Sequence, residues 1–208
     1  VEQTYSSKIS KFVGTMYLEN PELWSCDNPV LYTLRTRVIK DGQLVDEVCT
    51  TFGVRSICFD KDKGFLLNGI QTKINGVCIH HDGGAVGAAV PEVVWERRLK
   101  LLKEMGCNAI RMSHNPPAPE LLDMCDRMGF LVMDEAFDEW KIIKAKGDDQ
   151  IARYGYGQFF EQDCEKDLLA MIRRDRNHPS IILWSIGNEI PEQSTSDGWK
   201  IAKRLKEL

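Results

Sequence analysis

The chain has 208 residues, of which 43% are hydrophobic and 28% are charged, and its formal net charge at pH 7 is -4. This composition is typical of a globular protein with enough apolar side chains for a sizeable core. Because basic and acidic residues are interleaved, no basic surface for nucleic acid is predicted. No apolar run approaches the roughly 20 residues of a membrane span. We expect a soluble protein without nucleic acid or membrane partners, in either the periplasm or the cytoplasm.

The 7 cysteines are spread singly along the chain, and no C-x-x-C pair occurs among them. Tetrahedral zinc sites usually take their ligands from closely spaced pairs, and a disulfide framework usually has an even number of cysteines. The cysteines are therefore predicted to act mainly as small buried hydrophobic residues.

Residues 1–60 are predicted to form part of a β-sandwich. From Phe12 to Asp60 the apolar residues recur with a period near two, which is typical of antiparallel strands with one solvent-facing side. Asp41-Gly42 separates two such runs and predicts a hairpin turn. A complete sandwich usually needs about 100 residues. We therefore expect the C-terminal part of a sandwich whose first strands lie upstream.

Residues 61–208 show short apolar strands that alternate with long amphipathic helices. Strands are predicted at 73–79, 109–112 and 130–133 and within 180–190, and helices at 92–105, 117–128 and 159–174 and from 199 onward. Gly106 and Gly129 follow the first two helices as stop signals. Strands that helices join in this order form right-handed βαβ units and a parallel sheet.

Polar side chains follow the end of each predicted strand of this sheet. They are His80, His81 and Asp82, then Ser113, His114 and Asn115, then Asp134 and Glu135, and finally Asn188 and Glu189. A doubly wound sheet often carries a glycine-rich phosphate turn after its first strand, whereas the sequence here is CIHHDGG. A (β/α)8 TIM barrel places its catalytic groups at the C-terminal ends of several strands. The α/β pattern therefore predicts the N-terminal half of such a barrel, truncated about four βα units before closure.

The ordered set of motifs resembles glycoside hydrolase family 2, the β-galactosidase and β-glucuronidase family. The motifs are NG (68–69), GVCIHHD (76–82), NAIRMSHNP (108–116), VMDEA (132–136), RDRNHPS (174–180) and WSIGNE (184–189). PELWS (21–25) and FGVR (52–55) are similar to the immunoglobulin-like sandwich that precedes the barrel in that family. The resemblance implies a retaining exo-β-glycosidase that hydrolyses terminal β-linked sugars, with β-galactosidase activity expected first.

Glu189 is the candidate general acid/base. Retaining hydrolysis needs a carboxylic acid that protonates the leaving oxygen and a second carboxylate about 5–5.5 Å away that attacks the anomeric carbon. At the mouth of an apolar strand, beside Trp184 and Ile190, Glu189 is expected to be partly desolvated. The alternative is a carboxylate near the start of the next helix. The resemblance assigns the acid role to Glu189, gives Asn188 a hydrogen bond to the sugar 2-hydroxyl, and places the nucleophile outside this chain.

Four further residues are candidates for substrate binding. By the resemblance, His80 and His114 contact the sugar, although either ring could instead satisfy backbone groups in its turn. Arg111 is expected to point inward and to meet a carboxylate, because an unpaired buried guanidinium is costly. The resemblance identifies that carboxylate as the nucleophile. Asp134 is the fourth candidate, although Asp134 and Glu135 could equally form a solvated acidic pair.

The loop after the third strand bears on metal binding. The resemblance implies that some β-galactosidases of the family bind magnesium there through a Glu and a His two residues later. Glu139 fits the first position, but Lys141 takes the second, and an ammonium cannot be a ligand. We therefore expect neither a metal nor a cofactor. Trp140 is expected either to offer its apolar face to a sugar ring or to pack the loop.

Other functions remain open. The first is β-glucuronidase or β-mannosidase activity within the same family, and the second is a non-catalytic carbohydrate-binding module. An endo-acting barrel glycanase is disfavoured by the preceding sandwich segment. We expect a carbohydrate substrate as the partner, self-association through the open barrel edges, and no activity from these 208 residues alone.

Overall fold

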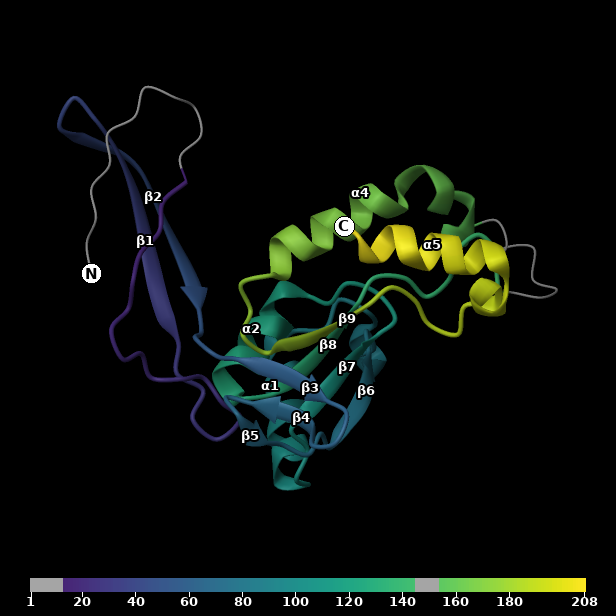
Figure 1. Cartoon of the computed structure of the whole chain (residues 1–208), viewed down its shortest axis with the longest axis horizontal. Coiled ribbons are helices and arrows are strands. Elements are labelled where there is room, and N and C mark those ends of the chain that lie inside the picture. The colour runs from purple at the N-terminus through teal and green to yellow at the C-terminus, as the bar shows by residue number, and fades with distance from the viewer. Residues whose placement is uncertain (1–12, 145–153) are drawn as a thin grey trace.

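The computed structural model of the chain describes residues 13–144 and 154–208 (Figure 1). Residues 1–12 of the expected sandwich segment lie outside the described residues. Among the described residues, no helix is both long and apolar enough to cross a membrane.

The predicted half-barrel is present. Its four strands are parallel and lie in the order β6-β7-β8-β9, with the bounds β6 (Gly76–His80), β7 (Ala109–Ser113), β8 (Leu131–Glu135) and β9 (Ile181–Ser185). The helices are α1 (Glu92–Glu104), α2 (Pro119–Met128), α4 (Phe160–Asp175) and α5 (Ser196–Lys206), with short 3-10 turns at η1 (Gly84–Val86), η2 (Tyr156–Gln158) and η3 (Pro191–Ser194). The alternation of strand and helix that the sequence predicts is thus confirmed.

Local sequence explains where the helices begin and end. Pro119 is the first residue of α2, where its missing N–H costs nothing. Gly129 ends the same helix in the left-handed region, with φ of 68°, and Gly106 follows α1 with φ of 84°. On the inner side of α1, Trp95 and Leu99 are buried in a core shared with α2 and the sheet. Figure 1 shows α4 and α5 side by side, and Arg204 Nε lies 3.0 Å from Glu165 Oε1 between them.

A small antiparallel sheet closes the N-terminal end of the half-barrel. Its strands are β3 (Ile57–Asp60), β4 (Gly64–Leu67) and β5 (Ile70–Gln71). A buried cluster joins it to the first residues of the barrel strands and contains Trp24, Phe65, Leu67, Ala109, Leu131 and Ile182. The boundary predicted between residues 60 and 61 falls in the β3–β4 turn. The sheet that packs on the barrel therefore begins a few residues earlier than that boundary.

The hairpin of β1 (Tyr32–Lys40) and β2 (Gln43–Phe52) projects away from the half-barrel (Figure 1). Its predicted turn is confirmed, because Asp41 and Gly42 both have positive φ, as a tight hairpin requires. The expectation that one face is buried is wrong for the described residues. Side chains on both faces of the hairpin are exposed, including Val48 on one face and Cys49 on the other, since no described element covers either face.

The interior of the half-barrel is open. In the sheet of the described residues, β6 and β9 are the outer strands, and each pairs on one side only. Cys78, Arg111, Met133 and Leu183 lie in register across the sheet, and all are half-buried or exposed. A mostly apolar hollow of about 190 Å³ lies over this layer. The side chains that would fill the centre of a closed barrel are thus accessible.

Candidate active site

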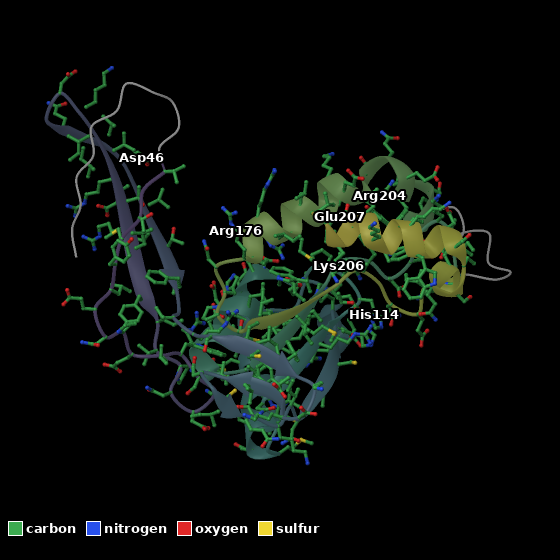
Figure 2. The ribbon with its side chains drawn as sticks, viewed as in Figure 1. Asp46, His114, Arg176, Arg204, Lys206 and Glu207 are labelled. Carbon is green, nitrogen blue, oxygen red and sulfur yellow. The ribbon has the colours of Figure 1, made fainter. Side chains whose placement is uncertain are left out.

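The candidate site lies at the C-terminal ends of the four parallel strands. His80 is paired in register with Ser113, and Glu135 with Ser185, so these residues form one layer across the sheet. Figure 2 shows His114 just beyond β7, at the end of the barrel that carries this layer. Arg176 lies at the far end of α4, well away from His114.

Glu135 lies at the centre of the site. Its side chain is 0% exposed, and the carboxylate accepts two hydrogen bonds from Arg111, with Nε 2.9 Å from Oε2 and Nη2 3.1 Å from Oε1. Ser185 Oγ donates to Oε2 at 2.6 Å, and His114 Nδ1 lies 2.6 Å from Oε1. A buried charge of this kind is tolerated only when it is paired and hydrogen-bonded. The alternative of a solvated acidic pair at Asp134 and Glu135 is therefore wrong.

Arg111 points inward and meets a carboxylate, as expected. Within the described residues that carboxylate is Glu135 of the neighbouring strand. The pairing with a nucleophile, which the resemblance implied, involves a residue outside this chain. Its Nη2 also donates to Asn188 Oδ1 at 2.9 Å. Arg111 therefore ties the second, third and fourth strands of the half-barrel together.

Asn188 is buried, and its contacts determine the orientation of its amide. Oδ1 accepts from Arg111, and Nδ2 donates to Asp138 Oδ1 at 3.0 Å. The reverse orientation would place an NH2 group against the guanidinium. The backbone N–H of Asn188 donates to Phe137 O at 3.0 Å. One N–H of the side-chain amide remains after the bond to Asp138, so Asn188 can still donate to a ligand.

Glu189 follows Asn188 in the left-handed region, with φ of 44°. Its side chain is exposed, and no hydrogen-bond partner occurs for it in the described part of the chain. The expectation of partial desolvation is therefore wrong here. The neighbouring Trp184 is itself 40% exposed. The carboxyl group is accessible to a ligand above the strand ends.

His80 and His114 lie together. Their ring centroids are 5.1 Å apart and their planes are almost perpendicular. His80 is exposed, whereas His114 is half-buried and is bound to Glu135. The structure thus brings five predicted site residues to one region, namely His80, Arg111, His114, Asn188 and Glu189.

Asp134 does not join them. Consecutive residues of a strand point to opposite faces, so Asp134 points away from Glu135 and is fully buried beside Asp175 of α4. Burial, together with the adjacent Asp175 carboxyl group, raises the pKa of Asp134 to about 8. Asp134 cannot contact a sugar held above the strand ends. The prediction that it binds substrate is therefore wrong, and Asp134 is a buried structural residue.

Trp140 also lies outside the site. Its side chain is 3% exposed, its ring stacks on Phe160 with a centroid distance of 5.7 Å, and Nε1 donates to Ile186 O at 2.7 Å. Neither ring face is free for a sugar. The alternative in which Trp140 packs the loop is the one that this structure shows.

The loop residues do not fit a magnesium ion. Both carboxylate oxygens of Glu139 accept backbone N–H groups, from Gly157 and Lys144, each at 3.0 Å. Lys141 Nζ lies 2.6 Å from Glu161 Oε1 and 3.3 Å from Asp197 Oδ2. An ammonium paired with two carboxylates thus occupies the position at which the resemblance implied a histidine ligand in some family members.

Elsewhere among the described residues, one group has metal-ligating geometry, formed by Asp123, Asp126 and His178. Two of these residues already bind each other, since His178 Nδ1 lies 2.6 Å from Asp126 Oδ2. Asp126 Oδ1 also accepts the backbone N–H of Ser180 at 3.1 Å. These bonds join α2 to the start of β9. The cluster is therefore explained by its structural role and does not require a metal.

Sequence reasoning missed Glu135 as the centre of the site, and it missed Asp138, Lys144 and Ser185. A signal for Glu135 was available. Arg111 lies in register with Met133, and Glu135 is two residues further along the same face, within reach of a guanidinium. For Asp138 and Lys144 no such signal exists, because the loop has no repeating pattern.

The chain is similar to known glycosyl hydrolases in sequence and in fold. The model of the family "Glycosyl hydrolases family 2, TIM barrel domain" matches residues 60–208, and a second model, "Glycosyl hydrolases family 2", matches residues 2–55. A β-galactosidase of Bacteroides ovatus is 53% identical over 192 residues, which are 92% of this chain and 21% of that protein. A β-glucuronidase of Bacteroides fragilis is 34% identical over 180 residues, which are 85% of this chain and 25% of that protein.

The similar solved structures include a glycosyl hydrolase family 2 member from Bacteroides cellulosilyticus. Its TM-score is 0.83 at 45% identity, and the match covers 90% of this chain and 23% of that one. The chain spans about a fifth to a quarter of the length of these relatives.

Proposed function

Because the chain belongs to glycosyl hydrolase family 2, we propose that it is part of a longer retaining exo-β-glycosidase that hydrolyses terminal β-linked sugars. One observation carries the proposal. Asn188 and Glu189 follow the fourth barrel strand, Asn188 is held by Arg111 and Asp138, and the Glu189 carboxyl group is exposed above the strand ends. This places an accessible carboxyl group beside an amide that can bind a sugar hydroxyl.

Glu189 is the proposed acid/base. In the first step its carboxylic acid donates a proton to the leaving glycosidic oxygen, and in the second step its carboxylate takes a proton from the attacking water. Both steps require direct access to the substrate. Asn188 donates its remaining amide N–H to the sugar 2-hydroxyl, and His80 and His114 form a wall of the sugar site.

The nucleophile belongs to a later barrel strand outside these residues. Glu135 is the other strand-end carboxylate that lies within the site, but it is fully buried, and Arg111, His114 and Ser185 all bind it. An attacking carboxylate must reach the anomeric carbon about 5–5.5 Å from the acid/base. Glu135 is therefore assigned to holding Arg111 and His114 in place.

The proposed substrate is a terminal β-galactoside, and a β-glucuronide or β-mannoside is the second choice. The higher identity to the Bacteroides ovatus β-galactosidase supports this order. No metal and no cofactor take part at Glu139 and Lys141, since both side chains are bound within the protein. Hydrolysis rates for a panel of aryl β-glycosides test this order of substrates. Hydrolysis of glucuronides alone would show that a β-glucuronide, not a β-galactoside, is the substrate.

The test of the reaction is Glu189→Gln in the full-length enzyme. Glutamine cannot donate the proton, so hydrolysis of alkyl glycosides is expected to vanish, while activated aryl glycosides keep part of their turnover. Glu120→Gln, at an exposed glutamate at the start of α2, is the control and should leave both rates unchanged. Equal losses for both substrate types would remove Glu189 from the acid role. Sugar binding without hydrolysis by the unmodified enzyme would favour the carbohydrate-binding module instead.

A further inference from the structure

Lys144 contacts the backbone immediately before Glu189. Its Nζ donates a hydrogen bond to the carbonyl oxygen of Asn188, which belongs to the peptide bond between Asn188 and Glu189. The same ammonium lies 3.2 Å from Asp138 Oδ1, and the side chain is 24% exposed. The cation therefore lies one peptide unit from the proposed acid/base.

Asp138 joins this contact to the sugar-binding amide. Its Oδ1 accepts from both Lys144 Nζ and Asn188 Nδ2. Burial alone would raise the pKa of Asp138, but the hydrogen bonds from Asn188 and Lys144 lower it below its usual range. Asp138 is thus an ionised bridge between Lys144 and Asn188.

The turn at Asn188 and Glu189 is therefore held by one loop at three points. The loop provides the Phe137 carbonyl oxygen to the Asn188 N–H, the Asp138 carboxylate to the Asn188 amide, and the Lys144 ammonium to the Asn188 carbonyl oxygen. Glu189 needs such support, because a non-glycine residue in the left-handed region is held there by its surroundings.

We infer that Lys144 is a positioning residue for the acid/base, acting on the peptide plane before Glu189 and, through Asp138, on the amide of Asn188. The inference rests on the proposed function of Glu189. It predicts that loss of the ammonium impairs proton donation more than substrate binding, because the geometry between the carboxyl group and the leaving oxygen is disturbed.

The experiment compares Lys144→Met, Lys144→Arg and Lys141→Met in the full-length enzyme. Lys141 is the matched control, since it lies in the same loop but pairs with Glu161 and Asp197. Lys144→Met is expected to lower kcat for alkyl glycosides roughly tenfold to a hundredfold, with a much smaller loss for activated aryl glycosides and a nearly constant KM. Lys144→Arg should retain most of the kcat of the unmodified enzyme. Lys141→Met should change kcat only slightly, and to the same extent for alkyl and activated aryl glycosides.

Asp138→Asn gives a second measurement on a variant that keeps Lys144, and by itself it should lower kcat for alkyl glycosides more than for activated aryl glycosides. Its effect on kcat should be non-additive with that of Lys144→Met if the two side chains act as one unit. The same kcat loss for alkyl and activated aryl substrates in Lys144→Met, or additive effects in the double variant, would overturn the inference. If Glu189→Gln itself showed no dependence on the leaving group, the proposed function would fail instead.

Discussion

Arg111 and Glu135 face each other from neighbouring strands, with guanidinium Nε and Nη2 both directed at one fully buried carboxylate. The pair forms the floor of the site. Through Asn188 it reaches the turn that carries Glu189, so the geometry of the proposed acid/base depends on an ion pair to which the proposed mechanism assigns no chemical step.

Removal of Arg111 should therefore affect the fold as well as activity. In Arg111→Met the buried Glu135 loses its charge partner, and breaking such a pair typically costs about 3–5 kcal/mol of unfolding free energy. Arg111→Lys keeps the charge but not the paired donors, so its cost should be smaller. Chemical denaturation of the full-length enzyme measures both. Glu135→Gln added to Arg111→Met should recover part of the loss, and strictly additive effects would show that the pair is not coupled.

The buried carboxyl pair of Asp134 and Asp175 predicts a pH dependence of stability. The pKa of Asp134 is about 8 in the folded protein, against about 3.9 in an unfolded chain. The folded state therefore keeps a proton that the unfolded state releases. The contribution of this group to stability is fully present below about pH 4 and declines as the pH rises through about 8.

Asp134→Asn should remove that decline and make the protein more stable than the unmodified one at pH 8. Urea unfolding between pH 5 and 9 measures the difference. Asp46→Asn, at an exposed position in the β1–β2 hairpin (Figure 2), is the control. Its free energy of unfolding should depend on pH in the same way as that of the unmodified protein. If the Asp134→Asn variant also shows the pH dependence of the unmodified protein, the carboxyl group does not retain its proton on folding.

Gly129 should be essential for docking the segment around Trp24 onto the barrel. A Cβ at Gly129 would lie 2.3 Å from the Cys26 carbonyl oxygen, and φ is 68°. Gly129→Ala is therefore expected to cost clearly more than the roughly 1–2 kcal/mol of left-handed strain alone. Gly69→Ala is the matched control, since Gly69 has φ of 78° but open space around it. Equal melting temperatures for the two variants would mean that the backbone at Cys26 moves aside freely.

These 208 residues, expressed alone, should self-associate and be catalytically silent. Within the described residues β6 and β9 each pair with a strand on one side only, and the inward-facing layer around Met133 is accessible. Light scattering should show oligomers or aggregates. A monomer that unfolds cooperatively would contradict the first expectation. Glu189-dependent hydrolysis by this segment would contradict the second and would make Glu135 the first residue to test as the nucleophile.

The sequence alone was sufficient for the architecture of the half-barrel. Periods of two and of about 3.6 residues, together with stop signals such as Gly106 and Gly129, are local properties, so the order of strands and helices follows from them. The strand ends follow from the same pattern. Because catalytic groups of barrels cluster at the C-terminal ends of strands, His80, His114, Asn188 and Glu189 were predicted to lie together. The cost of an unpaired buried guanidinium predicted that Arg111 points inward to a carboxylate. The roles of these residues toward the sugar were implied by the family resemblance.

Only the tertiary structure decided which neighbouring side chain belongs to the site. Asp134 and Glu135 are adjacent and chemically similar, yet one points to α4 and the other to Arg111. A strand alternates its faces, but the register with its neighbours determines which face is the interior. Trp140 was ambiguous for a related reason, because a loop aromatic packs or stays exposed according to what lies above it. Lys144 and Asp138 reach Asn188 across more than forty positions of chain, and a contact between a patternless loop and a strand end exists only once the chain has folded.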